Sequence, residues 1–183
     1  MSRLTAIACL LASLLAGDAA ATVFVPREFS ELVRASRAIA YGQVVGIRAR
    51  QTSDRVRVET LVTLRVAAYL KGDLGQEVTF VVPGGTFGRY RTLIVGAPEF
   101  RQGEEVVLFL NARGPSMPYV LRLAQGVFRV VRQPGSGERA IAPSPLVAQS
   151  LEWKTVVRGD PARKPMSLVD FATEVRRLAE GGR

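Results

Sequence analysis

Apolar and polar side chains alternate most regularly over residues 56–70. One side of this segment carries, in order, Val56, Val58, Thr60, Val62, Leu64, Val66, Ala68 and Leu70. A period of two over such a length predicts a long strand that is buried on one face. Residues 38–50 are also predicted to form a strand, and Gly42 and Gly46 predict a bend or bulge within it. The polar turn at 51–54 predicts that the two segments pair as a hairpin.

Shorter strands are predicted further along the chain, at 78–82, 90–95, 105–110, 119–123 and 127–132. The segment 105–110 is apolar on both faces, which predicts a strand that is covered from both sides. The sequence Pro83-Gly84-Gly85 interrupts the chain between two of these strands. Pro, Gly and Ser are frequent over 133–145, and this composition predicts a surface loop.

Apolar residues recur at helical spacing in two segments, one before the first predicted strand and one after the last. Towards the carboxyl end, this spacing relates Leu168, Phe171, Ala172, Val175, Leu178 and Ala179. Ser167 precedes them and Asp170 follows three residues later, as in a capping box, so the helix is predicted to begin there. A shorter helix is predicted at 28–36, with Phe29, Leu32 and Val33 as its apolar stripe.

These elements predict a mainly β fold. Six or seven strands with a short N-terminal helix and a C-terminal helix suit a small antiparallel, OB-like barrel, with a core over about 38–132. A β-sandwich is the main alternative. The sequence shows no internal repeat and no second domain, so residues 22–183 are predicted to form one domain.

The first residues have the pattern of a secretion signal. A positive charge at Arg3 precedes an apolar segment at 4–16 that is too short to span a bilayer, and the small residues at 19–21 suit a signal peptidase. Cleavage after Ala21 would make 1–21 the signal peptide and Thr22 the first residue of the exported chain. Lipidation of Cys9 is the less favoured alternative, because this cysteine comes early in the apolar segment. We therefore expect a soluble periplasmic or extracellular protein without a transmembrane segment.

The residue types that are missing restrict the chemistry. The chain has no histidine, and its single cysteine, Cys9, lies in the predicted signal. Ser-His-Asp and Cys-His catalysis, zinc sites built from His and Cys, and disulfides are therefore excluded from the exported chain. No cofactor and no metal are expected.

The charge pattern points away from nucleic acid as a partner. Twenty-five basic residues against 16 acidic residues give a net charge of +9. Lysine occurs only at Lys71, Lys154 and Lys164, and the arginines are scattered along every segment. Scattered charge is typical of a solvated surface rather than of a polyanion site. A basic exported protein can still adhere to anionic polymers of the cell envelope.

Several strand motifs resemble a known family. They are Ile39-Ala40-Tyr41-Gly42-Gln43-Val44-Val45, Ala68-Tyr69-Leu70-Lys71-Gly72 and Gly103-Glu104-Glu105-Val106-Val107-Leu108-Phe109-Leu110. In this order they resemble the netrin-like module, the OB-type barrel found in tissue inhibitors of metalloproteinases. The chain resembles still more a group of uncharacterised exported bacterial proteins, which share Pro83-Gly84-Gly85, Gly96-Ala97-Pro98-Glu99-Phe100 and Gln125-Gly126-Val127-Phe128. The resemblance covers roughly 29–131 and implies the barrel fold.

Several groups of residues imitate inhibitory or catalytic sites. The inhibitors reach the protease zinc through an amino-terminal cysteine, whereas the exported chain would begin at Thr22. Gly135-Ser136-Gly137 has the form of a nucleophile turn but lacks a histidine to activate it. Ser150 and Lys154 could form a Ser-Lys dyad, because they would lie on the same side of a helix if one formed there. Glu99, Glu104 and Glu105 could act as an acid/base pair or bind a hard cation, but solvated turn carboxylates explain them better.

The segment 86–91 is the best candidate for function. Phe87, Arg89, Tyr90 and Arg91 alternate aromatic and guanidinium groups beside glycines, a composition that is common in contact hot spots. The alternative is a hairpin whose Phe87 and Tyr90 plug the barrel end. We expect an exported, non-enzymatic binding module that contacts an exported protein or an anionic envelope polymer. Inhibition of, or partnership with, an exported metallopeptidase and weak hydrolase activity are the alternatives.

Overall fold

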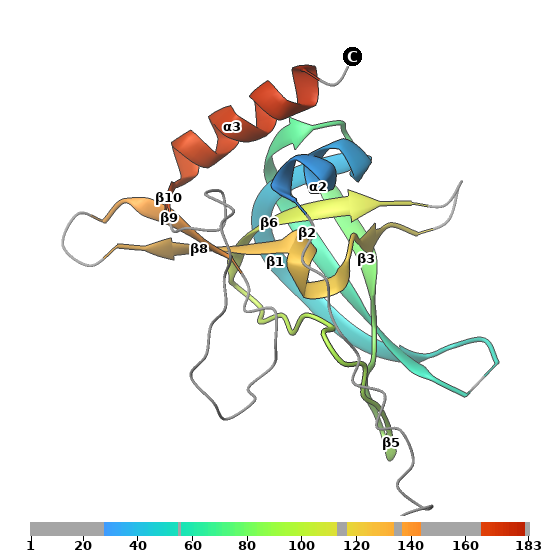
Figure 1. Cartoon of the computed structure of the whole chain (residues 1–183). Coiled ribbons are helices and arrows are strands. Elements are labelled where there is room, and N and C mark those ends of the chain that lie inside the picture. The colour runs from blue at the N-terminus through green and yellow to red at the C-terminus, as the bar shows by residue number, and fades with distance from the viewer. Residues whose placement is uncertain (1–27, 55, 113–116, 134–136, 144–165, 182–183) are drawn as a thin grey trace, which may run out of the picture.

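The computed structural model describes residues 28–54, 56–112, 117–133, 137–143 and 166–181 (Figure 1). Its elements are α2 (Phe29–Ala35), β1 (Ala38–Gln51), β2 (Val58–Lys71), β3 (Glu77–Pro83), β4 (Gly85–Phe87), β5 (Tyr90–Thr92), β6 (Glu105–Asn111), β7 (Tyr119–Val120), the 3-10 turn η1 (Leu123–Gly126), β8 (Val127–Arg132), β9 (Arg139–Pro143), β10 (Met166–Ser167) and α3 (Leu168–Glu180). The prediction of a mainly β chain with a short N-terminal helix and a C-terminal helix is confirmed.

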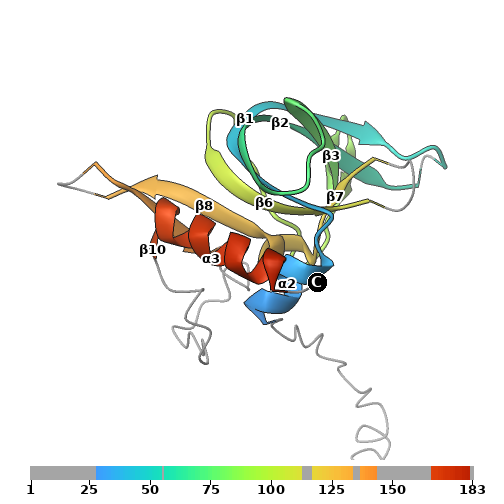
Figure 2. The ribbon, with the colours of Figure 1, turned by 90° about the horizontal axis from the view of Figure 1, so that it is seen from above.

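Eight strands form one sheet in the order β1-β2-β3-β7-β6-β8-β9-β10, and β1 also pairs with β6. Strands β1, β2, β3, β7 and β6 therefore form a partial ring, in which β3 and β7 are joined by the single pair of Val81 with Tyr119 (Figure 2). This pair is parallel, so the sheet is mixed and the prediction of an antiparallel arrangement is wrong at this point. A ring of five strands has an odd number of pairings, so it cannot be antiparallel throughout.

The hairpin of β1 and β2 confirms the predicted bends. Its antiparallel register shifts between Tyr41 and Gly42 and again between Val44 and Gly46. At Gly42 the two strands approach so closely that a Cβ atom would lie 2.2 Å from the carbonyl oxygen of Arg65. Glycine is thus required at this bend by the close approach of another backbone.

Strand β6 separates two apolar cores and is buried on both faces, as its sequence predicts. Inside the partial ring, the buried core residues are Ala40, Val44, Val62, Leu64, Val78, Phe80, Val82, Val106, Leu108, Leu110, Val120 and Val127. Between the two helices and the sheet, the buried core residues are Phe29, Leu32, Val33, Ile39, Leu70, Val107, Phe109, Leu121, Phe128, Ile141, Phe171 and Val175. Because side chains alternate along a strand, neighbouring residues of β6 enter different cores.

Both helices form the cover of the second core (Figure 2). The N-cap Ser167 accepts a hydrogen bond from the backbone N–H of Asp170, at 3.0 Å, so the predicted start of α3 is confirmed. At the other helix, the Nζ of Lys71 donates to the carbonyl oxygens of Val33 and Arg34, at 2.7 and 3.0 Å. These bonds satisfy carbonyl groups that the last turn of α2 leaves without helical partners.

Three predicted boundaries are wrong. The strand predicted at 90–95 ends at Thr92 and belongs to a separate two-stranded sheet. The strand predicted at 119–123 stops at Val120, because η1 follows. The loop predicted at 133–145 contains β9, which pairs with β8 through residues such as Ile141, and the two-residue β10 pairs with β9. Proline and glycine around β9 concealed a strand that contributes Ile141 to the helix-covered core.

The predicted signal lies outside the described residues, together with Cys9, Ala21 and Thr22. Within the part of the chain that the structure describes, no helix has both the length and the apolar character needed to cross a membrane.

Candidate contact surface

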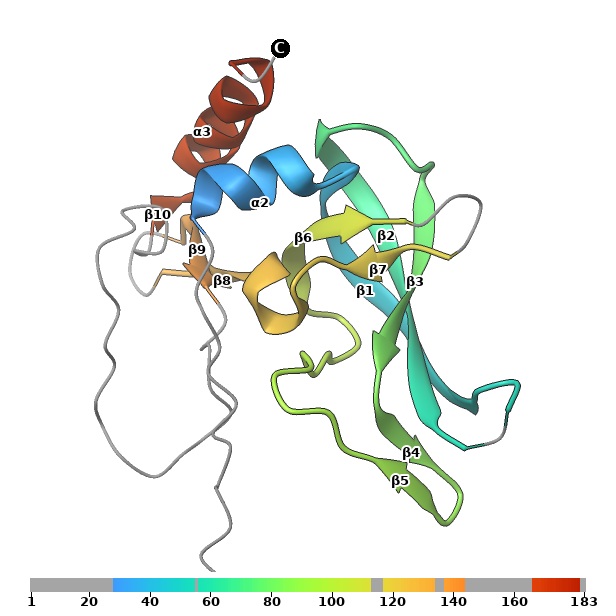
Figure 3. The same cartoon turned by 45° about the vertical axis from the view of Figure 1, so that its right-hand side comes forward.

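Strands β4 and β5 form a two-stranded ribbon that projects from the sheet at the end opposite the helices (Figure 3). Its cross-strand pairs are Gly85 with Thr92, Thr86 with Arg91 and Phe87 with Tyr90. Gly88 forms the turn with a φ of +57°, and a Cβ atom there would have no neighbour within 4 Å. The ribbon therefore places residues 87–91 at a tip that is open to solvent.

The base of the ribbon is held against β2. The backbone N–H of Val58 donates to Thr92 Oγ1 at 2.8 Å, and Thr60 Oγ1 donates to the carbonyl oxygen of Gly84 at 2.8 Å. Gly85 has a φ of +135° and lies against Thr60, where a Cβ atom would come within 2.4 Å of Oγ1. Consequently the ribbon starts from a defined position even though its tip is exposed.

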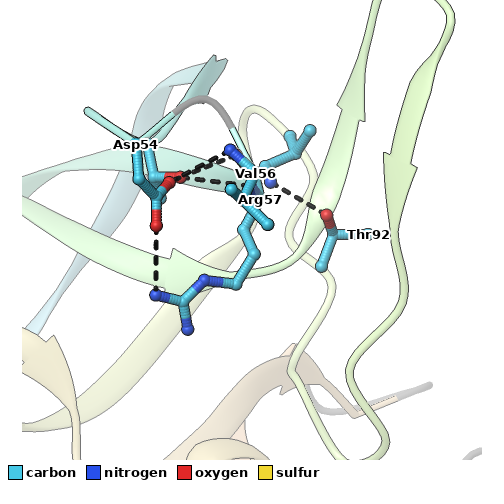
Figure 4. A network of polar contacts seen from close by, with 6 residues as sticks. Asp54, Val56, Arg57 and Thr92 are labelled. Carbon is cyan, nitrogen blue, oxygen red and sulfur yellow. Dashed lines mark hydrogen bonds and ion pairs between the residues drawn. The ribbon is translucent and has the colours of Figure 1, made fainter.

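A polar network at the β1–β2 turn adjoins this base (Figure 4). Asp54 accepts hydrogen bonds from the Thr52 hydroxyl and from the backbone N–H of Val56, and its Oδ2 lies 3.7 Å from Arg57 Nη2. The hydrogen bond from Thr52 and then that from Val56 lower the pKa of Asp54. The carboxylate thus stays ionised, and it holds the turn that leads to Val58 and its bond with Thr92.

The sequence-predicted contact residues divide into two groups. Phe87 and Tyr90 are cross-strand neighbours at the tip, with 45% and 46% of their surfaces exposed. Arg89 donates from Nη2 to Tyr90 Oη at 3.0 Å, and its guanidinium carbon lies 5.1 Å from the Tyr90 ring centroid. Arg91 lies instead on the Thr86 side of the ribbon. Neither aromatic ring belongs to an apolar core, so the barrel-plug alternative has no support.

Arg91 lines a cavity of about 330 Å³ at the base of the ribbon, which we call the basal hollow. The apolar side chains that line it are Ile47, Val82, Pro83, Leu93, Ile94, Ala97, Pro98 and Phe100. Thr60, Thr92 and Glu99 add polar groups. Among the described residues, the Arg91 guanidinium and the Glu99 carboxylate have no hydrogen-bond or ion-pair partner. A mostly apolar cavity with a few polar groups is the usual composition of a binding site.

Exposed apolar residues near the ribbon extend the surface beyond what the sequence predicted. Leu93 is 76% exposed and Val95 is 68% exposed, although a strand was predicted across both. Of ten large apolar side chains that are exposed in the described residues, seven lie on the ribbon, its following loop or the β1–β2 hairpin: Ile47, Val56, Phe87, Tyr90, Leu93, Ile94 and Val95. In the sequence, this exposed surface could have been suspected from the three consecutive apolar residues Leu93-Ile94-Val95 immediately before Gly96.

The three candidate glutamates do not form one site. Glu99 lines the basal hollow, whereas Glu104 Oε2 lies 3.4 Å from Arg129 Nε. Glu105 Oε2 accepts hydrogen bonds from the Tyr41 hydroxyl and, at 3.1 Å, from Arg139 Nε. The described residues contain no group of three or more acidic, His or Cys side chains placed to hold a metal ion.

Glu105 is a hydrogen-bonded carboxylate with an arginine beside it. The hydrogen bond from Tyr41, followed by the nearby Arg139, lowers the Glu105 pKa, while burial and then Glu105 raise the Tyr41 pKa. A carboxyl group with a lowered pKa is ionised at neutral pH and is a poor proton donor. The geometry therefore favours a structural role for Glu105.

The remaining catalytic candidates, Ser136, Ser150 and Lys154, lie outside the described residues. What the described part of the chain presents is a surface for contact: exposed aromatic and aliphatic groups, arginines and a hollow at the base of the ribbon. Comparisons with protein-family models, curated proteins and solved structures find no match.

Proposed function

We propose that this protein is an exported, non-enzymatic binding module whose contact surface lies at the ribbon end. The ribbon end is defined here by Ile47, Val56, Phe87, Arg89, Tyr90, Arg91, Leu93, Ile94 and Val95. The observation that carries the proposal is that seven of the ten large exposed apolar side chains in the described residues gather there. Scattered exposed apolar residues are ordinary, but a concentration with aromatic and arginine side chains is typical of protein interaction sites.

The charges favour an acidic protein as the partner. In the described part of the chain, the side chains of Arg48 and Arg91 have no hydrogen-bond or ion-pair partner, and Arg89 contacts only Tyr90. Against these cations, Glu99 is the acidic group of the basal hollow. The whole chain carries a net charge of +9, which would assist association with an acidic surface.

The strand topology is one reason to propose a barrel-like fold. The pairings that link β1, β2, β3, β7 and β6 are compatible with a small OB-like, netrin-like barrel, with β8, β9 and α3 added to one side. We propose this barrel as the fold of a single exported domain over 22–183. OB-type barrels commonly bind through one face and its neighbouring loops, and the ribbon end lies among such loops.

The alternative functions have weaker support. Metallopeptidase inhibition would depend on Thr22, and hydrolysis on Ser136, Ser150 or Lys154, and none of these four residues lies within the described part of the chain. No described residue favours either activity over binding. Binding of an anionic envelope polymer is one outcome that the test can detect, because arginines alone would suffice to attract such a polymer.

The proposal is tested by a pull-down from the envelope fraction of the native host, quantified by mass spectrometry. We expect Arg89→Ala with Arg91→Ala, and separately Phe87→Ala, to reduce recovery of one partner by about thirtyfold, as truncation of a hot spot does. Arg176→Ala is the matched control, because this arginine is exposed and α3 lies at the opposite end of the molecule from the ribbon (Figure 3). Equal recovery with all variants would overturn the proposal.

A further inference from the structure

We infer that the basal hollow receives an apolar side chain from an acidic, extended segment of the partner protein. The inference rests on the proposed function and names the chemistry of the partner. It follows from three independent features of the ribbon base: the shape and walls of the hollow, the charges at its rim, and the edges of β4 and β5 that have no strand partner among the described residues.

The walls of the hollow select an apolar group. Its volume of about 330 Å³ is within the range of small ligand sites, and Ile47, Ile94 and Phe100 are among its walls. Leu93 continues the apolar surface into solvent with 76% of its surface exposed. Burying such aliphatic groups against an apolar side chain is favourable, at about 25 cal/mol per Å² of apolar area. A polysaccharide offers much less apolar surface, so the walls favour a peptide.

The rim selects acidic residues. Arg91 lines the hollow, and Arg89 lies two residues away at the tip of the ribbon. The Arg91 guanidinium has no partner in the described residues, so its five N–H donors are available to a carboxylate. Glu99 on the same hollow would repel an anion placed beside it, so the carboxylates of the segment should lie towards the ribbon.

The ribbon favours an extended conformation of the bound segment. β4 and β5 pair only with each other in their sheet, so each strand has one edge without a strand partner among the described residues. Unpaired edges bind extended peptides by adding a strand, and main-chain hydrogen bonds then supply affinity while pockets take alternate side chains. Both β4 and β5 contribute to the hollow, through Thr86 and Arg91 among others.

The test uses the full chain and short fluorescent peptides of alternating glutamate and leucine, with binding followed by fluorescence anisotropy. We expect the Glu/Leu peptide to bind, and peptides with lysine in place of glutamate, or serine in place of leucine, to bind about tenfold more weakly or not at all. N-methylation of every residue should abolish binding, because it removes the donors on both edges of the peptide, including those needed for strand pairing.

Matched variants locate the binding. Leu93→Asp and Arg91→Glu should each weaken the Glu/Leu peptide by about tenfold or more. Val169→Asp is the control for the first, since Val169 is 74% exposed on α3, and Arg176→Glu is the control for the second. Both controls should bind like the wild type. Circular dichroism and thermal unfolding of each variant would detect any that failed to fold.

Several results would overturn the inference. These are equal binding of the Glu/Leu and Lys/Leu peptides, retention of binding by the N-methylated peptide, loss of binding in the α3 controls, and preference for polygalacturonate over the peptide. If no peptide binds but the envelope pull-down still recovers a partner through Phe87 and Arg89, the inference fails and the proposed function stands. If the pull-down also shows no dependence on these residues, the proposed function fails.

Discussion

Phenylalanine is buried at one end of the molecule and exposed at the other. At the helix-covered end, Phe29, Phe109, Phe128 and Phe171 are at most 4% exposed. Their ring centroids lie between 5.0 and 6.4 Å apart, in tilted or edge-to-face pairs. At the ribbon end, Phe87 is 45% exposed and stands beside Tyr90 at the tip. Aromatic content alone therefore does not identify the core.

The difference arises from what lies opposite each ring. The sheet and two helices enclose the four phenylalanines, so several elements share the burial of each ring. The ribbon has only two strands and carries no helix over its tip (Figure 3). An isolated two-stranded ribbon contributes little stability by itself. We therefore expect stability to depend on the helix-covered end and binding on the ribbon end, and the following changes test this separation.

The largest effect is expected from Phe171→Ala. Phe171 is fully buried and contacts three other phenylalanine rings, so its truncation leaves a cavity and should cost about 3 to 5 kcal/mol in the free energy of unfolding. The measurement is the midpoint of denaturant unfolding. Val169→Ala on the exposed side of α3 is the control and should change stability by at most about 0.5 kcal/mol. An unchanged midpoint for Phe171→Ala would show α3 to be dispensable.

Gly42→Ala should have the next largest effect. The added Cβ atom would lie 2.2 Å from the Arg65 carbonyl oxygen, so the strands must move apart, at a cost of about 1 to 3 kcal/mol. Gly46→Ala is the control, because its nearest neighbour, the Cβ of Thr63, would lie at an ordinary 3.5 Å. Thermal unfolding of both variants measures the difference. Equal melting temperatures would contradict the close approach of β1 and β2.

Tyr41→Phe should have a smaller effect that depends on pH. It removes the hydrogen bond that contributes most to the lowered Glu105 pKa. A hydrogen bond to a partly exposed carboxylate is worth about 1 to 2 kcal/mol, so the loss of stability at neutral pH should be of this size. A carboxyl group with a lowered folded pKa stabilises the fold above its unfolded pKa, and this contribution is lost as pH falls through the folded pKa.

Urea unfolding between neutral and acidic pH measures this dependence. The difference between wild type and Tyr41→Phe should shrink as Glu105 becomes protonated. Tyr69→Phe is the control, because the Tyr69 hydroxyl donates to the carbonyl oxygen of Gly75 and not to a carboxylate. Its effect should stay constant over the same pH range. If the difference for Tyr41→Phe stayed constant with pH, the Tyr41 hydroxyl would not stabilise the fold through its hydrogen bond to Glu105.

The smallest effect on stability is expected at the ribbon tip. Arg89→Ala with Arg91→Ala should alter the free energy of unfolding by no more than about 0.5 kcal/mol, because both side chains are exposed. Phe87→Ala should also leave thermal stability nearly unchanged while it removes the partner. A large fall in melting temperature for Phe87→Ala would show that Phe87 contributes to stability. It would contradict the separation of stability and binding between the two ends.

Local pattern was sufficient where each element has a regular period or a cap. The strands β1, β2, β3, β6 and β8 were predictable because their apolar residues alternate or run together, and Ser167 with Asp170 identified the start of α3. The contact residues Phe87, Arg89, Tyr90 and Arg91 were predictable as an unusual composition beside Gly88. Their exposure was left open between a contact site and a plug.

Only the tertiary structure decided which pairings close the sheet and which side chains remain exposed. The parallel contact of Val81 with Tyr119 depends on a ring of five strands, and no local sequence pattern encodes that odd number. Leu93, Ile94 and Val95 look like strand residues in the sequence, yet they line or extend the basal hollow because no element covers them. Periodicity depends on neighbours along the chain, whereas burial depends on whether another layer packs opposite, and that is determined by the whole fold.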